Sequence, residues 1–277
     1  MVRSPAVAGQ FYQGTTQKLQ QQVSQYLQKD LGRDHAVGVM VPHAGLIYSG
    51  AVAGTVYSSI TMPKTFVMLG PNHTGLGSSV SLMDDGEWEV PTGKLRVDRK
   101  LASRILQHAK VAERDAKAHT FEHSLEVQLP FITCLSTDIA IVPIAILSAS
   151  YEECTELAEG IAKAVQGVDY PVTILASSDM SHYLPDRVAR QKDKLALDRV
   201  LEMDPRGLYD TVRRERISMC GYLPATVMLI AAKMLGAKEA FLVKYMTSGD
   251  VSGDYESVVG YAGIVLTTKK SDRRAAS

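Results

Sequence analysis

Apolar residues along this chain form short continuous runs that alternate with segments of helical periodicity. In the segment 16–29, for example, Leu19, Val23, Tyr26 and Leu27 follow the spacing of an amphipathic helix. Helical periodicity also predicts helices over 98–108, 151–165, 187–201 and 224–235. Strand-length apolar runs predict strands over 36–41, 65–69, 138–147, 172–176, 240–246 and 257–267.

Most of the predicted strands are apolar on both faces, and predicted helices lie between the second and third strands and between the third and fourth. Such strands are typical of a sheet that helices cover on both sides, so the fold class is α/β. No linker, repeat or low-complexity stretch interrupts the pattern, so we expect one domain over residues 1–268. The final segment, 269–277, is polar, and we expect it to be a disordered tail.

Composition argues against nucleic-acid-binding, membrane and disulfide-rich secreted proteins. The 277 residues carry 30 basic and 30 acidic side chains, a balance that argues against nucleic-acid binding through a large positive field. No apolar run approaches the roughly 18 residues of a membrane helix, and the N-terminal segment lacks a signal-peptide core. Three scattered cysteines do not form a disulfide framework, so we expect a cytoplasmic protein without membrane partners.

Three of the predicted strands end in similar polar segments. His43 follows 36–41, His73 follows 65–69, and both Asp179 and His182 follow 172–176. Ligands of open α/β sheets bind beyond the carboxyl ends of the strands, where these side chains could converge. Imidazole is the commonest ligand for transition metals in proteins. A lone histidine in such a place is more often a turn or capping residue, and only the repetition makes a metal site an equal alternative.

Cys220 precedes the apolar helix predicted over 224–235. The positive end of a helix dipole lowers the pKa of a nearby thiol and favours thiolate, which is a metal ligand and a nucleophile. Inert packing is an equal alternative for Cys220, and Cys134 and Cys154 are most simply packing residues. His123 lies between Glu122 and Ser124, where it could assist a site or belong to the polar face of a short helix, the simpler interpretation.

Common catalytic motifs are absent. The sequence contains no HExxH, paired CxxC, Gly-x-Ser-x-Gly or P-loop motif. The glycines at 75 and 77 follow a strand but lack the third glycine of a dinucleotide site. Asp179 and His182 lie close to Ser177 and Ser178, but no oxyanion-hole motif supports a serine hydrolase.

Six short motifs, taken together and in order, resemble the Memo (mediator of cell motility) family. The resemblance extends from about residue 3 to residue 266. The motifs are Ala8-Gly9-Gln10-Phe11-Tyr12, Pro42-His43-Ala44-Gly45, Gly70-Pro71-Asn72-His73, Glu122-His123-Ser124, Ser177-Ser178-Asp179-Met180-Ser181-His182 and Met219-Cys220-Gly221.

The resemblance implies a fold similar to the class III extradiol (LigB-like) dioxygenases, an α/β/α sandwich around a mixed, largely parallel sheet. It also implies a mononuclear non-haem metal site in which His43, His73 and Cys220 are the ligands, with Asp179, His182 and His123 lining the pocket. Fe(II) is the expected metal, with Cu or Zn as alternatives. The dioxygenases use a glutamate where this chain has a thiol, so their activity does not follow from the fold.

These observations leave three functional hypotheses. The first is an oxidoreductase, redox or dioxygenase-like, acting on an unknown small molecule, with His182 or His123 as general acid/base and Asp179 orienting an imidazole. The second is a non-catalytic adaptor whose pocket binds an anionic, phosphorylated ligand, although Tyr222 and Leu223 replace the basic pair of the animal relatives. The third is metal storage or delivery. Prokaryotic proteins similar to this one are associated with radical-SAM proteins, which makes such a protein a candidate partner.

Overall fold

The computed structural model describes residues 1–29 and 31–269. The elements, in chain order, are β1 (Val2–Arg3), α1 (Thr16–Tyr26), β2 (Ala36–Val41), α2 (Leu46–Ser59), β3 (Thr65–Pro71), β4 (Val80–Leu82), β5 (Glu87–Val90), β6 (Gly93–Val97), α3 (Arg99–His108), β7 (Glu113–Arg114), η1 (Lys117–His119), η2 (Glu126–Gln128), α4 (Leu129–Leu135), β8 (Ala140–Ile146), α5 (Tyr151–Gln166), β9 (Val172–Ser177), β10 (His182–Leu184), α6 (Asp186–Leu201), α7 (Pro205–Arg214), α8 (Tyr222–Met234), β11 (Glu239–Thr247), α9 (Gly249–Ser252) and β12 (Val258–Thr267).

One mixed sheet organises the described residues, with strand order β1-β5-β6-β8-β3-β9-β2-β12-β10. Its centre is parallel, because β6, β8, β3, β9 and β2 pair with their neighbours in the same direction. The antiparallel strand β12 then pairs with β2, β10 and β11. The carboxyl ends of β3, β9 and β2 therefore lie side by side at one edge of the sheet.

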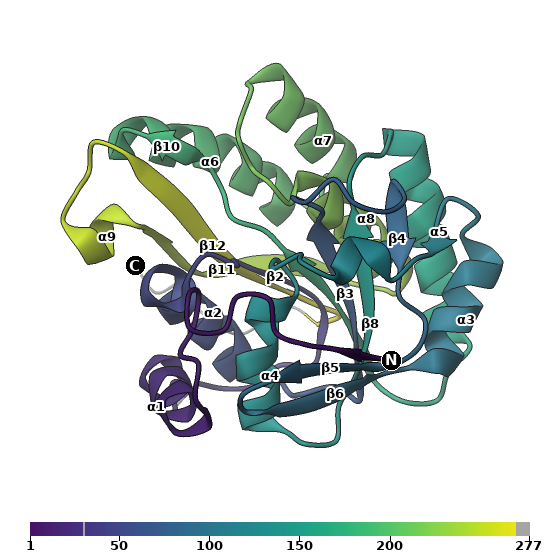
Figure 1. Cartoon of the computed structure of the whole chain (residues 1–277). Helices are drawn as coiled ribbons and strands as arrows, with labels where there is room; N and C mark the ends of the chain where they lie inside the picture. Colours follow the sequence, from purple (N-terminus) through teal and green to yellow (C-terminus); the bar gives the residue numbers. More distant parts are fainter. Residues whose placement is uncertain (30, 270–277) are drawn as a thin grey trace.

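Helices cover both faces of the sheet (Figure 1). On one face, α2 packs on β2, β11 and β12, and α1 and α4 pack beside it. On the other face, α8 packs on β2, β3 and β9, and α3, α5, α6 and α7 extend this layer. The α/β/α sandwich expected from the sequence is confirmed.

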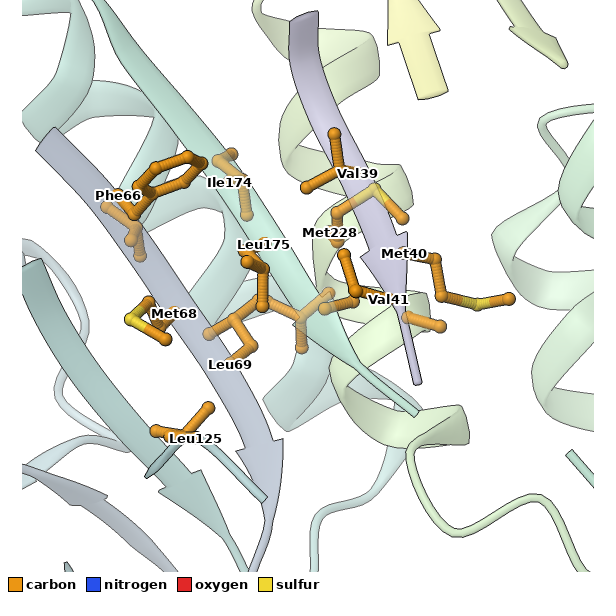
Figure 2. Packing of buried hydrophobic residues seen from close by; sticks show 14 of the residues in the cluster. Val39, Met40, Val41, Phe66, Met68, Leu69, Leu125, Ile174, Leu175 and Met228 are labelled. Atoms are coloured by element: carbon orange, nitrogen blue, oxygen red, sulfur yellow. The ribbon is translucent and has the colours of Figure 1, made fainter. Parts of the chain in front are cut away.

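The core lies between the sheet and the two helical layers. Side chains of β2, β3 and β9 extend from both faces of the sheet, and Figure 2 shows Val39 and Leu175 from the strands together with Met228 from α8. All three are fully buried. Glycine at position 38 brings α8 close to the sheet, because a Cβ there would lie 2.7 Å from the Sδ of Met228. This close packing holds the carboxyl ends of the central strands in fixed positions.

The strands and helices predicted from the sequence are present, with ends shifted by a few residues. Asp98 caps α3 as expected, since its Oδ1 accepts the amide of Leu101 at 3.0 Å. Helix α2, which follows β2 directly, was not predicted from the sequence. Most residues of α2 are buried, so the helix has no polar face and its sequence shows no helical periodicity.

All three cysteines of the chain lie within the described residues. Cys134, Cys154 and Cys220 are free thiols. Among the described helices, none combines the length and hydropathy needed to cross a bilayer. The expected disordered tail lies, apart from its first residue, outside the described residues, and it stays a prediction.

A buried carboxylate anchors the N-terminal segment to the rest of the domain. Glu126, which has no exposed side-chain surface, pairs with Arg3 and accepts the hydroxyl of Tyr12. Its two oxygens also accept the amides of Ala6, at 2.8 Å, and Val7, at 3.0 Å. The chain segment that follows Arg3 is therefore held against the same loop that carries Glu122 and His123.

We predict that Glu126→Gln lowers the free energy of unfolding by about 3–5 kcal/mol, because it leaves the buried Arg3 without a charged partner. The matched control is Asp138→Asn, which removes the exposed pair with Lys64 and changes stability by less than about 1 kcal/mol. Chemical denaturation of the two variants measures both values. Equal losses in the two variants would show that Glu126 is not the anchor.

Candidate functional site

The candidate site lies beyond the carboxyl ends of the three neighbouring strands. His43 comes two residues after β2, His73 two residues after β3, and Asp179 two residues after β9. Because the strands are parallel and β9 lies between the other two, their ends bring these residues together. The expected convergence of His43, His73 and Asp179 is present in the structure.

Three imidazoles form the centre of the site. His43, His73 and His123 each present one ring nitrogen, and these three atoms all lie within 4.8 Å of one another. The ring centroids are 5.4 Å apart for His43 and His73, and 4.7 Å for His73 and His123. His43 is buried, His123 is partly buried and His73 is about one third exposed, so the cluster opens to solvent on one side.

The hydrogen bonds of Ser177 fix the tautomer of His43. The Ser177 hydroxyl donates its one proton to the backbone carbonyl of Ser124, at 2.7 Å. The same oxygen accepts a hydrogen bond from the side-chain amide nitrogen Nε2 of Gln128, at 2.9 Å. The Nδ1 of His43 lies 2.9 Å from the same oxygen, so Nδ1 carries the proton and donates it. The Nε2 lone pair of His43 is left for another partner.

Glu122 fixes the second imidazole in the same way. Its Oε1 lies 2.9 Å from the Nδ1 of His73, and an ionised carboxylate only accepts hydrogen bonds. The His73 ring therefore donates through Nδ1 and leaves Nε2 open. Oε1 also lies 3.4 Å from the Nδ1 of His123. A carboxylate that orients metal-binding imidazoles from behind is common in metalloproteins.

Cys220 lies beside His43, with 3.3 Å between its Sγ and the Nε2 of that ring. The Asp179 amide donates to the same sulfur at 3.3 Å. The Asp179 carboxylate accepts the backbone amide of His43 at 2.8 Å, so it holds the backbone of His43 while Ser177 holds the ring. Glycine at 221 permits this approach, because a Cβ there would lie 2.4 Å from the carbonyl oxygen of Ser177.

Burial controls the charges of these groups. It lowers the pKa of His43 well below the ordinary value, as do the neighbouring imidazoles, so the ring is neutral. Burial raises the pKa of Asp179, against the opposing amide of His43. The pKa of Cys220 is also raised, by burial and by Asp179. The lowered thiol pKa expected from the helix dipole is therefore wrong, because desolvation outweighs it.

His182 lies on β10, which pairs with the antiparallel strand β12. Its Nδ1 lies 2.8 Å from the Ser218 carbonyl, which can only accept, so Nδ1 is protonated. Among residues 1–29 and 31–269, Nε2 of His182 has no hydrogen-bond partner. His182 is partly exposed and does not belong to the three-imidazole cluster. The next residue, Tyr183, has a φ of 58°, a left-handed conformation that is rare for an aromatic residue.

A cavity of about 330 Å³ adjoins the cluster. Its lining includes His73, Cys220 and Arg213. Arg213 was not predicted as a site residue, because no sequence motif relates α7 to the strand ends. The orienting roles of Glu122 and Ser177 were also not predicted, although both stand in the quoted motifs beside a candidate residue.

The lowered pKa of Glu122 predicts that the free energy of unfolding depends on pH. Burial alone would raise its pKa, but the hydrogen bond and charge of His73 and the amide of Ser124 lower it to about 2, from an ordinary value of 4.5. The lowered pKa stabilises the folded state above pH 4.5, and this stabilisation is lost as the pH falls towards 2. We predict a smaller loss of stability over this range in Glu122→Gln, measured by urea unfolding. Identical pH profiles would contradict the assignment.

Comparisons with known proteins identify the family of this chain. Residues 3–265 match the family described as Memo-like protein. A MEMO1 family protein of Methanopyrus kandleri is 39% identical over 96% of this chain and 99% of its own length. One of Saccharolobus solfataricus is 42% identical over 94% of this chain and 98% of its own. The crystal structure of an uncharacterized Escherichia coli K12 protein shares the fold alone, with a TM-score of 0.56 and 15% identity over 82% of this chain and 98% of that one. The chain therefore belongs to the Memo-like family.

Proposed function

We propose that the three-imidazole cluster binds one transition-metal ion and that the protein is a non-haem metal-dependent oxidoreductase. The observation that carries the proposal is the convergence of His43, His73 and His123 with ring nitrogens within 4.8 Å. For His43 and His73 the Nδ1 protons are used by Ser177 and Glu122, so each ring offers its Nε2. Oriented imidazoles with this second layer of hydrogen bonds suit a metal ion.

The third ligand is either His123 or Cys220. The three-imidazole grouping supports His123, while the 3.3 Å contact between Cys220 and the Nε2 of His43 supports the thiol. In our proposal His43 and His73 bind the ion in either case. Fe(II) is the proposed metal; a thiolate ligand would also suit Cu or Zn.

A bound iron or copper ion would supply one-electron redox chemistry and open positions for O₂ and substrate. The protein would contribute orientation and proton transfer. Glu122 and Ser177 hold the imidazoles, and Asp179 holds the backbone of His43. His182, with a free Nε2, is the proposed general base, and His123 takes this role if Cys220 is the third ligand.

Metal analysis of protein purified without oxygen tests this proposal. We predict about one equivalent of metal in the wild type and its loss in the double variant His43→Ala and His73→Ala, because each change removes a ligand. The matched control is His35→Ala, outside the cluster, which should keep the wild-type content. Equal metal in all three proteins, or none in the wild type, would contradict the proposal.

Cobalt substitution assigns the third ligand. If Cys220 binds the ion, the near-ultraviolet thiolate charge-transfer band of the Co(II) protein disappears in Cys220→Ser and persists in His123→Ala. If His123 binds it instead, no such band is present and His123→Ala weakens metal binding by roughly 10-fold or more. Wild-type affinity and an unchanged spectrum in both variants would exclude both residues.

An adaptor or a metal-storage protein would use the same residues without turnover. Consumption of O₂ with a bound substrate, lost in the double variant His43→Ala and His73→Ala, separates the oxidoreductase from both. Rapid transfer of the ion to a chelator would favour storage or delivery. About one third of the His73 side chain is exposed, so a chelator can approach the ion from that side.

A further inference from the structure

A buried glutamine lies behind the His43 side of the imidazole cluster. Gln128, the last residue of η2, has no exposed surface. Its side-chain Nε2 lies 2.9 Å from the backbone carbonyl oxygen of Pro42 and 2.9 Å from the Oγ of Ser177. Its Oε1 lies 3.0 Å from the hydroxyl oxygen of Tyr57. One amide therefore joins the residue before His43, the end of β9 and helix α2.

The contacts of Gln128 allow only one orientation of its amide. A backbone carbonyl only accepts hydrogen bonds, so the atom that faces Pro42 is the amide nitrogen and not the oxygen. The amide oxygen then faces Tyr57 and accepts its hydroxyl proton. Burial raises the pKa of Tyr57, so the phenol keeps this proton. Both amide protons are used, one on Pro42 and the other on Ser177.

This donation limits the hydrogen bonds that the Ser177 hydroxyl can make. A hydroxyl has one proton and two lone pairs. The amide of Gln128 fills one lone pair, and the backbone carbonyl of Ser124 takes the proton, at 2.7 Å. One lone pair remains, and the Nδ1 of His43 lies 2.9 Å from the oxygen that carries it. The Ser177 oxygen is thus saturated only when His43 donates to it.

The two tautomers of His43 compete for the same serine. A ring protonated at Nε2 would need the Ser177 proton at Nδ1, which would leave the buried carbonyl of Ser124 without its donor. Gln128 opposes this rotation, because its N–H fixes the position of the serine oxygen and excludes the hydroxyl proton from a third direction. Without Gln128 the hydroxyl would be free to turn, and the Nε2-protonated ring would become accessible.

The two sides of the cluster differ in this respect. The ionised Glu122 has no proton to give, so it fixes the tautomer of His73 without help. A serine hydroxyl can donate or accept, so Ser177 fixes its histidine only if a third group orients the hydroxyl. Gln128 is the group that lies in hydrogen-bond distance to do so.

We propose that Gln128 is a positioning residue, which acts through Ser177 to keep the proton of His43 on Nδ1 and to leave the Nε2 lone pair for a ligand. The importance of Gln128 for metal binding rests on the proposed metal-dependent function. Its control of the tautomer does not, because every contact that fixes the ring lies within the chain.

Nitrogen-15 NMR of the metal-free full chain measures the tautomer of His43, whose signals are assigned by their loss in His43→Ala. We expect the wild type to carry the proton on Nδ1. Gln128→Met keeps the length of the side chain and removes both donated protons, so it should add a population protonated at Nε2. A ring protonated only at Nδ1 in Gln128→Met would overturn the proposal, as would a wild-type ring protonated at Nε2.

Tyr57→Phe is the matched control, because it removes a hydroxyl from the same buried network and leaves both amide protons of Gln128 in place. It should keep the wild-type tautomer, since the carbonyl of Pro42 still fixes the amide. A general loss of packing or stability would affect both variants. Equal shifts of the tautomer in Tyr57→Phe and Gln128→Met would therefore show a merely structural role and overturn the proposal.

The wild type tests the same geometry if Gln128→Met does not fold. The side-chain amide protons of Gln128 should exchange slowly with solvent and show a nuclear Overhauser effect to the Nδ1 proton of His43, because both groups donate to one serine oxygen. Fast exchange without this effect would overturn the proposal.

Titration of the same proteins with Co(II) separates this proposal from the function above. We expect Gln128→Met to bind the ion roughly 10-fold more weakly than the wild type and Tyr57→Phe. A shifted tautomer in Gln128→Met, with no metal bound by the wild type, would refute the metal site and support the positioning role. Metal bound by the wild type, with an unchanged tautomer in Gln128→Met, would have the opposite meaning.

Discussion

The candidate site depends on one constraint, the fixed direction of the hydrogen bonds at the histidine Nδ1 atoms. Ser177 and the ionised Glu122 can only accept from His43 and His73, so the fold determines both tautomers. The acceptors come from β9 and from the loop before η2, which the packed core holds in place. A shift of either element would release the rings and the Nε2 atoms that they present.

Most of the fold could be predicted from the sequence because the four central strands are apolar on both faces and a predicted helix follows three of them. The position of the site could also be predicted, since His43, His73 and Asp179 follow strands that turned out to be adjacent and parallel. The strand order itself was not visible in the sequence. The buried helix α2 was missed for a physical reason, because its lack of a polar face removes the periodic signal.

The contacts between side chains within the candidate site were harder to predict than its position at the carboxyl ends of the strands. Helix-dipole reasoning gave the wrong direction for the pKa of Cys220, because it neglects the desolvation that only the fold reveals. The neighbourhood of His123 and His73 depends on a loop without regular structure, and Arg213 reaches the cavity through packing of α7 against α8. Interactions of this kind join segments far apart in the sequence and leave no local pattern.

Together these features describe a half-open site. The buried carboxylate of Glu122 binds the Nδ1 of His73, and a cavity lined by His73 and Cys220 adjoins the imidazole cluster. The carboxylate favours a cation at the cluster.

The most direct test of the central claim is a crystal structure of the protein loaded with Fe(II) without oxygen, with the ion located by anomalous scattering. Our account predicts a peak within about 2.0–2.2 Å of the Nε2 atoms of His43 and His73, with their Nδ1 atoms still bonded to Ser177 and Glu122. A metal ion bound through Nδ1, or one bound away from these two histidines, would contradict it.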